Sequence, residues 1–373
     1  MFRSGTTFLS RFFDALPSVS SASDPLRPLI NDIRSVRLSG DSLYVPPKYP
    51  LQDYFLCQQE SFVKITCPFD EHHFTPEHFK TLKTSIVDRA SQFSQLYSSN
   101  LAASRKTFSS YRPFFDYLLE CINYTYPSRN GSYYNTITCF KEVWSIEFAY
   151  TLLRWYPDAF IVFISRDIRS VVASNRKMGG NYPLLFMARQ WRKQNLIAKH
   201  LKHLYPHNVI LIKFEDFFGD LSSNLPNLLQ ELAVPFNGNE LNSLQLKSGD
   251  NKAWKQNTSF TDSDESVSKS ISENLLEKSI LDTVTFLCYD QLVALGYDTY
   301  DFNIYDFDLL RDYHKTPSSL MSEWIQPFNL DFSSTLDYEL TTEKFRLHTP
   351  SFQSTHSEPR VPSLQSLVNH QWI

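Results

Sequence analysis

The chain has 373 residues, of which 42% are hydrophobic, and 36 Lys and Arg against 40 Asp and Glu give it a formal net charge of -4. This length allows one large or two smaller folded domains, and the charge balance excludes a globally basic surface for nucleic acid. Charged residues interrupt every apolar stretch before the roughly 18 residues that span a bilayer. We therefore expect a protein of the cytoplasm without a membrane span, in which any anion site is local.

Helical segments dominate the first third of the chain. Apolar residues at spacings of three and four predict a helix over 7–16, which Pro17 ends. From about 40 to 135, loops marked by proline alternate with segments of helical pattern. We interpret this stretch as a largely helical insertion.

An alternation of strands and helices follows the insertion. The apolar runs AFIVFIS at 159–165 and NVILIKFED at 208–216 are typical of strands buried on both faces of a parallel sheet. Helices are predicted between them, over about 167–178 and 184–204. The alternation predicts an α/β fold with a doubly wound, mostly parallel sheet flanked by helices.

The helix at 184–204 carries a stripe of cations, and the C-terminal part of the chain has a different character. The stripe consists of Arg189, Arg192, Lys193, Lys199 and Lys202. We expect it to be the solvated face of a helix that covers the sheet, with the steering of an anionic acceptor as the alternative. One domain is predicted over 1–300, followed by an irregular extension over 301–373.

The segment RSGTT, which begins at the third residue, has the composition of an anion-binding turn. Gly5 permits a tight turn, and the helix that follows would present unpaired N–H groups and its positive dipole end. The remaining donors are the guanidinium of Arg3 and the hydroxyls of Ser4, Thr6 and Thr7. A P-loop for ATP or GTP needs lysine where Thr6 stands, which argues against a kinase. A helix start without a ligand is the alternative.

A second candidate for anion binding is FISRDIRSVVASN at 163–175. Arg166 ends a predicted strand, and Ser174 follows eight residues later, about two turns along the next helix. Both can then face the carboxyl edge of the sheet, where open α/β folds bind ligands. A salt-bridged arginine and an ordinary helical serine form the alternative.

Together, RSGTTFL and FISRDIRSVVASN resemble the two nucleotide-binding signatures of the sulfotransferase family, whose P-loop-like domain uses 3'-phosphoadenosine 5'-phosphosulfate (PAPS). KFEDF at 213–217 and LGYD at 295–298 also resemble the family in order and spacing. The resemblance implies that Arg3, Ser4, Gly5, Thr6 and Thr7 hold the 5'-phosphosulfate. It assigns the 3'-phosphate to Arg166 and Ser174.

Further site residues follow from the same resemblance. KSGDNKAWKQ at 247–256 resembles a late loop that closes over the nucleotide, with Trp254 near the adenine and Lys247, Lys252 or Lys255 near the 3'-phosphate. A solvated basic loop is the alternative. Lys141 in CFKEVW resembles a lysine that contacts the 5'-phosphosulfate. Asp24 stands where the tyrosylprotein branch has its catalytic glutamate, and Glu142 is the alternative base. The catalytic candidates implied are therefore Arg3, Asp24, Lys141 and Glu142.

The resemblance implies transfer of a sulfuryl group, without a metal, to a hydroxyl of a carbohydrate, lipid or other acceptor. No histidine stands in either base region, which favours the carbohydrate and tyrosylprotein branches over the small-phenol branch. A homologue that binds nucleotide without turnover is an alternative, because the family's first strand has no counterpart before Arg3. We expect either a longer natural N-terminus, which could carry a Golgi anchor, or another segment in that place.

Overall fold

A computed structural model describes most of residues 4–238 and a part of the remaining chain. The described residues are 4–24, 26–38, 73–126, 137–177, 179–180, 182–238, 246, 276–299 and 343. They fall into two compact units. The first draws on Met1–Arg34, Cys67–Ser165 and Leu201–Lys269, and the second on Ser35–Thr66, Arg166–His200 and Ser270–Ile373.

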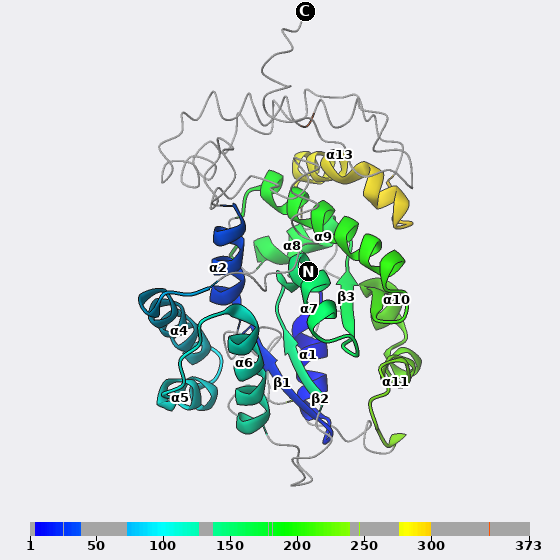
Figure 1. The fold of residues 1–373 in the computed structure, drawn as a ribbon. Coiled ribbons are helices and arrows are strands. Elements are labelled where there is room, and N and C mark those ends of the chain that lie inside the picture. Colours follow the sequence, from blue (N-terminus) through cyan, green and yellow to red (C-terminus); the bar gives the residue numbers. More distant parts are fainter. Residues whose placement is uncertain are drawn as a thin grey trace, which may run out of the picture. The chain divides into compact units, whose positions relative to one another are not determined.

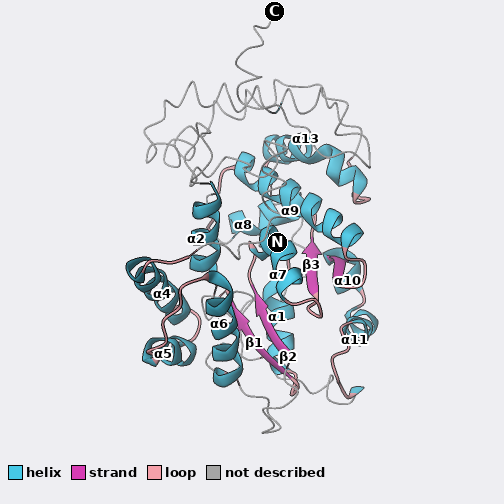
Figure 2. Cartoon of the chain, in the orientation of Figure 1, coloured by secondary structure: helices cyan, strands magenta, loops and turns pink. Residues whose placement is uncertain are grey.

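The described residues form four strands, all in the first unit, which make two parallel pairs. The first pair joins β1 (Val19–Ser23) to β2 (Ile137–Lys141), with Ser23 opposite Lys141. The second joins β3 (Ile161–Ser165) to β4 (Val209–Lys213), with Ser165 opposite Lys213. Among the described residues each pair is a separate two-stranded sheet (Figure 2). The prediction of a mixed α/β fold is confirmed, whereas the doubly wound sheet and the absent first strand stay predictions.

Helix α1 (Thr6–Ala15) packs against both strand pairs, and its bounds match the predicted helix to within one residue. Leu9, Phe12 and Phe13 belong to a buried cluster that also contains Val19 of β1 and Ile212 of β4. The connection to β1 is only three residues long, so the strand runs back along the helix. The N-terminus of α1 therefore lies toward the carboxyl end of β1 (Figure 1).

The described part of the predicted insertion is helical. It consists of α4 (Pro76–Ser91), α5 (Gln95–Ala103) and α6 (Tyr111–Thr125), and α2 (Arg27–Leu38) precedes it. Asp32 of α2 ties these helices together, because one of its carboxyl oxygens lies 2.8 Å from Nε2 of His78 and the other accepts a hydrogen bond from Tyr111 at 2.7 Å. The helices thus form a fixed body beside the first strand pair.

Short helices complete the first unit. A 3-10 helix, η1 (Ser145–Phe148), and α7 (Ala149–Trp155) connect β2 to β3, and α10 (Phe214–Gly219) and α11 (Leu221–Glu231) follow β4. The predicted strand over 208–216 therefore ends earlier than expected, since Phe214 already begins a helix.

The second unit contains α8 (Ile168–Lys177), α13 (Lys278–Ala294) and all but the last turn of α9 (Leu184–Leu204). The expectation of a solvated cation stripe on α9 is wrong for Arg189, Arg192 and Lys193, which are buried. Glu343, also buried, accepts hydrogen bonds from Arg189 and Arg192 at 2.8 to 2.9 Å. A partner more than 150 residues away therefore pairs with Arg189 and Arg192, while Lys199 remains exposed.

None of the described helices combines the length and the apolar character that crossing a bilayer requires. The three described cysteines, Cys121, Cys139 and Cys288, are free thiols.

Candidate active site

Three ionisable side chains meet at the carboxyl ends of β1 and β2. Lys141, the last residue of β2, places its Nζ 2.6 Å from Oδ2 of Asp24, the residue that follows β1. The side chains are 13% and 7% exposed respectively, so this is a largely buried ion pair. Glu142 follows Lys141 directly and is also buried. The structure thus brings together three of the four predicted catalytic residues.

The backbone fixes this cluster as firmly as the side chains do. The N–H of Asp24 donates to the carbonyl oxygen of Lys141 at 2.6 Å, the hydrogen bond that closes the parallel ladder at the Ser23–Lys141 pair. Asp24 has a φ of 53°, in the left-handed region that aspartate and asparagine tolerate better than most residues. This conformation turns the chain sharply where β1 ends, so the carboxylate stays beside Lys141.

Glu142 has the environment of a proton acceptor. Burial, followed by the nearby negative charge of Asp24, raises its pKa to about 7, against the lowering influence of Lys141, Arg27 and Arg89. Neither carboxyl oxygen has a hydrogen-bond partner among the described residues. Buried polar atoms are almost always paired, so an unsatisfied carboxyl group in a charged cluster is typical of a functional site.

The cations near Glu142 were not predicted from the sequence. Arg27 begins α2 and Arg89 lies in the last turn of α4, and both act on the Glu142 carboxyl through their charge. Neither arginine stands in a recognisable motif. The position of Arg27 three residues after Asp24 was the only available signal, because a chain that leaves a parallel strand at its carboxyl edge keeps the next residues close to that edge.

The anion-binding turn is described from Ser4 onward. Ser4 is fully buried, and Gly5 is the N-cap of α1 with a φ of 78°, which favours glycine. A Cβ at this position would lie 2.8 Å from a ring carbon of Phe214 and of Phe218. The glycine therefore serves both the turn and the packing of α1. As the N-cap it makes no side-chain hydrogen bond to the first turn of the helix.

The second motif lies in the other unit. Arg166 and Ser174 are both buried, Arg166 just before α8 and Ser174 in its second turn. The carbonyl oxygen of Arg166 accepts a hydrogen bond from the indole N–H of Trp191 at 2.8 Å. Asp167 caps α8 by accepting from the backbone N–H of Arg169 at 2.8 Å and also binds that residue's guanidinium. These contacts hold the backbone of Arg166 in place.

The other predicted site residues, Arg3, Lys252 and Trp254, lie outside the described residues. Within the described ranges, no group of three or more His, Cys, Asp or Glu side chains has the arrangement of a metal site.

Comparison with models of protein families gives a match. A model of the sulfotransferase family matches residues 1–238, which include the RSGTT turn, the cluster of Asp24, Lys141 and Glu142, and the motif with Arg166 and Ser174. The comparison with curated proteins returned no match. Because the family model covers more than half of the 373 residues, the chain belongs to the sulfotransferase family and is a transferase.

Proposed function

We propose that this protein transfers a sulfuryl group from PAPS to a hydroxyl group of a carbohydrate, lipid or other acceptor. The observation that carries the proposal is the buried cluster at the carboxyl ends of β1 and β2, in which Glu142 has a pKa raised to about 7 beside the ion pair of Lys141 and Asp24. A sulfotransferase needs a base for the acceptor hydroxyl and cations for the leaving phosphate. This cluster contains both.

We assign the base to Glu142 in preference to Asp24. The Asp24 carboxylate already accepts a hydrogen bond from Lys141, whereas the Glu142 oxygens have no partner among the described residues. A carboxyl group with a pKa near 7 is ionised in about half of the molecules at neutral pH and is a stronger base than an ordinary carboxylate. Asp24 then acts on the reaction through Lys141, as a positioning residue.

When bound, PAPS supplies the sulfuryl group, with adenosine 3',5'-bisphosphate as the leaving group. Glu142 accepts the proton of the acceptor hydroxyl while the hydroxyl oxygen forms the new bond to sulfur. Lys141 and the N–H groups of the first turn of α1 stabilise the negative charge that grows on the 5'-phosphate when its bond to sulfur breaks. Arg166 and Ser174 bind the 3'-phosphate in this proposal.

The nucleotide part of the proposal is tested by thermal unfolding with adenosine 3',5'-bisphosphate in the absence of metal. A ligand at 100 times its dissociation constant stabilises the folded state by about 2.7 kcal/mol, so we expect a clear rise in the midpoint. Arg166→Ala should abolish this rise. Lys199→Ala, which removes an exposed cation from the second unit, is the matched control and should keep it.

The transfer itself is tested by the release of adenosine 3',5'-bisphosphate from PAPS with a panel of hydroxyl acceptors. Release that depends on an acceptor supports the proposal. A midpoint shift without any release would instead support a homologue that binds the nucleotide and has lost catalysis. Equal shifts for the wild type and Arg166→Ala would refute the role of Arg166.

A further inference from the structure

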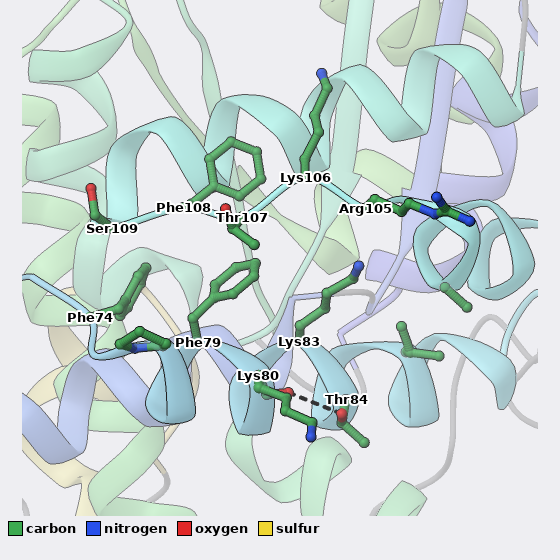
Figure 3. A pocket seen from close by; sticks show the side chains of 13 residues that line it. Phe74, Phe79, Lys80, Lys83, Thr84, Arg105, Lys106, Thr107, Phe108 and Ser109 are labelled. Atoms are coloured by element: carbon green, nitrogen blue, oxygen red, sulfur yellow. Dashed lines mark hydrogen bonds between the residues drawn. The ribbon is translucent and has the colours of Figure 1, made fainter.

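A second potential binding site lies in the helical body, on α4. A cavity of about 920 Å³ opens between this helix and the segment 105–109 that leads into α6. Its volume is in the range of about 300–1,000 Å³ that is usual for small-molecule pockets. Figure 3 shows Phe79 and Lys83 of α4 on one side of this cavity, with Phe108 and Arg105 on the other. Neither the family match nor the proposed reaction assigns a role to it.

The charges around the cavity have one sign. Four of its lining residues are cations, Lys80, Lys83, Arg105 and Lys106, and none is acidic. Lys106 pairs with Glu120 at 3.2 Å, outside the cavity. In a chain with a net charge of -4 this is a local concentration of positive charge, which attracts anions.

The remaining cations are available to a ligand. Lys83 donates to the backbone carbonyl of Ser104 at 2.5 Å, which leaves its charge without an acidic partner in the described structure. For the exposed Lys80 side chain and for the guanidinium of Arg105, the described residues provide no hydrogen bond or ion pair. Three positive charges therefore surround the cavity, and an anion could bind them with little competition.

The cavity also has an apolar wall of three phenylalanines. Phe74, Phe79 and Phe108 all line it, and the ring centroids of Phe79 and Phe108 lie 5.9 Å apart in an edge-to-face arrangement. Phe114 of α6 packs behind them, 5.1 Å from Phe79 and 5.6 Å from Phe108. Such a wall is complementary to an aryl or alkyl group.

The two sides of the cavity are held together. The N–H of Phe74 donates to the carbonyl of Ser109 at 2.7 Å, next to a backbone bridge between His73 and Ser110. Lys83 makes a similar connection to Ser104 at the other end. The site is thus formed before a ligand arrives, which lowers the entropic cost of binding.

We propose that this cavity binds a small amphipathic organic anion, such as an aryl or alkyl sulfate, sulfonate or carboxylate. The aryl or alkyl body would contact Phe79 and Phe108, and the charged group would meet Lys83, with Lys80 and Arg105 adding positive charge at the rim of the cavity. An anionic sugar fits less well, because no Asp, Glu, Asn or Gln lines the cavity to accept hydrogen bonds from sugar hydroxyls. The proposal does not depend on the transfer reaction.

The test measures the binding of three probes to the full chain, without nucleotide, by isothermal titration calorimetry. 2-Naphthalenesulfonate carries both an aryl body and a charge, naphthalene-2-sulfonamide has the body without the charge, and methanesulfonate has the charge without the body. We expect only the first to bind measurably. Equal binding of the sulfonamide and the sulfonate would overturn the proposed role of the cations.

Two variants locate the binding. Lys80→Ala/Arg105→Ala removes two exposed cations of the cavity and should weaken 2-naphthalenesulfonate binding about tenfold or more, since each charged contact contributes a few-fold. Arg154→Ala/Lys199→Ala removes the same charges at exposed positions that do not line the cavity and should leave the affinity unchanged. Equal affinities for the two variants would refute the site.

A membrane surface is the competing partner for a basic and aromatic site. Vesicles of phosphatidylserine and of phosphatidylcholine therefore complete the test. The proposal would be overturned in favour of a lipid headgroup by two results together: the protein binds phosphatidylserine vesicles but not 2-naphthalenesulfonate, and Lys80→Ala/Arg105→Ala abolishes the vesicle binding. The proposal would be supported if the wild type binds 2-naphthalenesulfonate in calorimetry and binds neither kind of vesicle.

Discussion

The two strand pairs of the first unit end in the same pairing of residues, but the residues that follow the strands differ. In each pair a serine at the end of the first strand lies opposite a lysine at the end of the second, Ser23 with Lys141 and Ser165 with Lys213. The next residues differ. After β1 and β2 come two buried carboxyl groups, whereas β3 is followed by a buried arginine and β4 by a buried phenylalanine.

This difference separates two tasks that an α/β edge can perform. The end of β1 and β2 gathers groups that can exchange a proton, around the ion pair of Lys141 and Asp24. The end of β4 supplies Phe214, which packs against Gly5 at the N-terminus of α1. One edge therefore carries the groups to which we assign the acid and base chemistry, and the other shapes the turn that we propose for the phosphosulfate.

The largest expected effect is the loss of turnover in Glu142→Gln. Glutamine keeps the shape of the side chain but cannot accept the hydroxyl proton, so turnover should fall about 10²–10⁴-fold, the usual contribution of general base catalysis. The rate of the wild type should rise with pH and level off above about 7, where Glu142 is ionised. Steady-state rates from pH 5 to 9 measure both effects.

Binding of adenosine 3',5'-bisphosphate is the control for Glu142→Gln and should be unchanged. If the variant keeps the wild-type rate and pH profile, Glu142 is not the base, and Asp24→Asn becomes the next variant to measure.

Loss of the ion pair between Asp24 and Lys141 should lower the free energy of unfolding more than loss of the lysine at the other edge. Lys141→Met leaves the Asp24 carboxylate buried without its partner, and breaking such a pair costs about 3–5 kcal/mol of unfolding free energy. Asp24→Asn/Lys141→Met should recover most of that loss, since no charge is left uncompensated. In the other pair, Arg166 rather than an aspartate follows the first strand, so Lys213→Met, at the matching register position, should cost less than Lys141→Met. Urea denaturation compares the three variants.

Equal losses for Lys141→Met and Lys213→Met would contradict this contrast. So would a double variant that is no more stable than Lys141→Met, because the loss would then come from the lysine's own packing.

Glu142 also makes stability depend on pH, with a sign opposite to that of an ordinary salt-bridged carboxylate. Its pKa is raised from 4.5 to about 7 by burial and by Asp24, so the folded state binds the proton more tightly than the unfolded state does. The contribution of Glu142 to the free energy of unfolding is therefore largest below pH 4.5 and is lost as the pH rises through about 7.

Glu142→Gln removes that dependence. At about 1.4 kcal/mol per pKa unit, the variant should gain roughly 3 kcal/mol relative to the wild type between pH 4.5 and 8. Denaturation in urea at several pH values measures the gain. Parallel curves for the two proteins would show that Glu142 has an ordinary pKa.

The two strand pairs also differ in how well the sequence predicts them. β3 and β4 are predicted because they are short apolar runs of the kind buried between layers. β1 is not, because three of its five residues, Ser20, Ser21 and Ser23, are serine. Two of these hydroxyl groups are tolerated in the interior because they donate to backbone carbonyl oxygens, Ser20 to that of Tyr126 at the α6 C-cap and Ser21 to that of Ser10 in α1. No pattern in five residues reveals partners that the tertiary structure provides.

The same reason limits the prediction of the site. The family resemblance suggested Asp24, Lys141 and Glu142 one by one, but only the parallel register brings Asp24 to Lys141 across 117 residues of sequence. The buried cations of α9 show the opposite error. Their spacing indicates a solvated face, and Glu343, which neutralises Arg189 and Arg192, stands in a segment without a recognisable motif.

The smallest of the expected effects concerns the turn before α1 and tests whether the β4 edge shapes it. Gly5→Ala places a Cβ 2.8 Å from ring carbons of Phe214 and Phe218 in a left-handed conformation, which costs about 1–3 kcal/mol. Gly219→Ala is the matched control, because no atom lies within 4 Å of its added Cβ and alanine is the better helix former. Thermal unfolding should show a lower midpoint for Gly5→Ala only. If the two variants unfold together, Phe214 and Phe218 move aside at little cost, and the turn does not depend on the β4 edge.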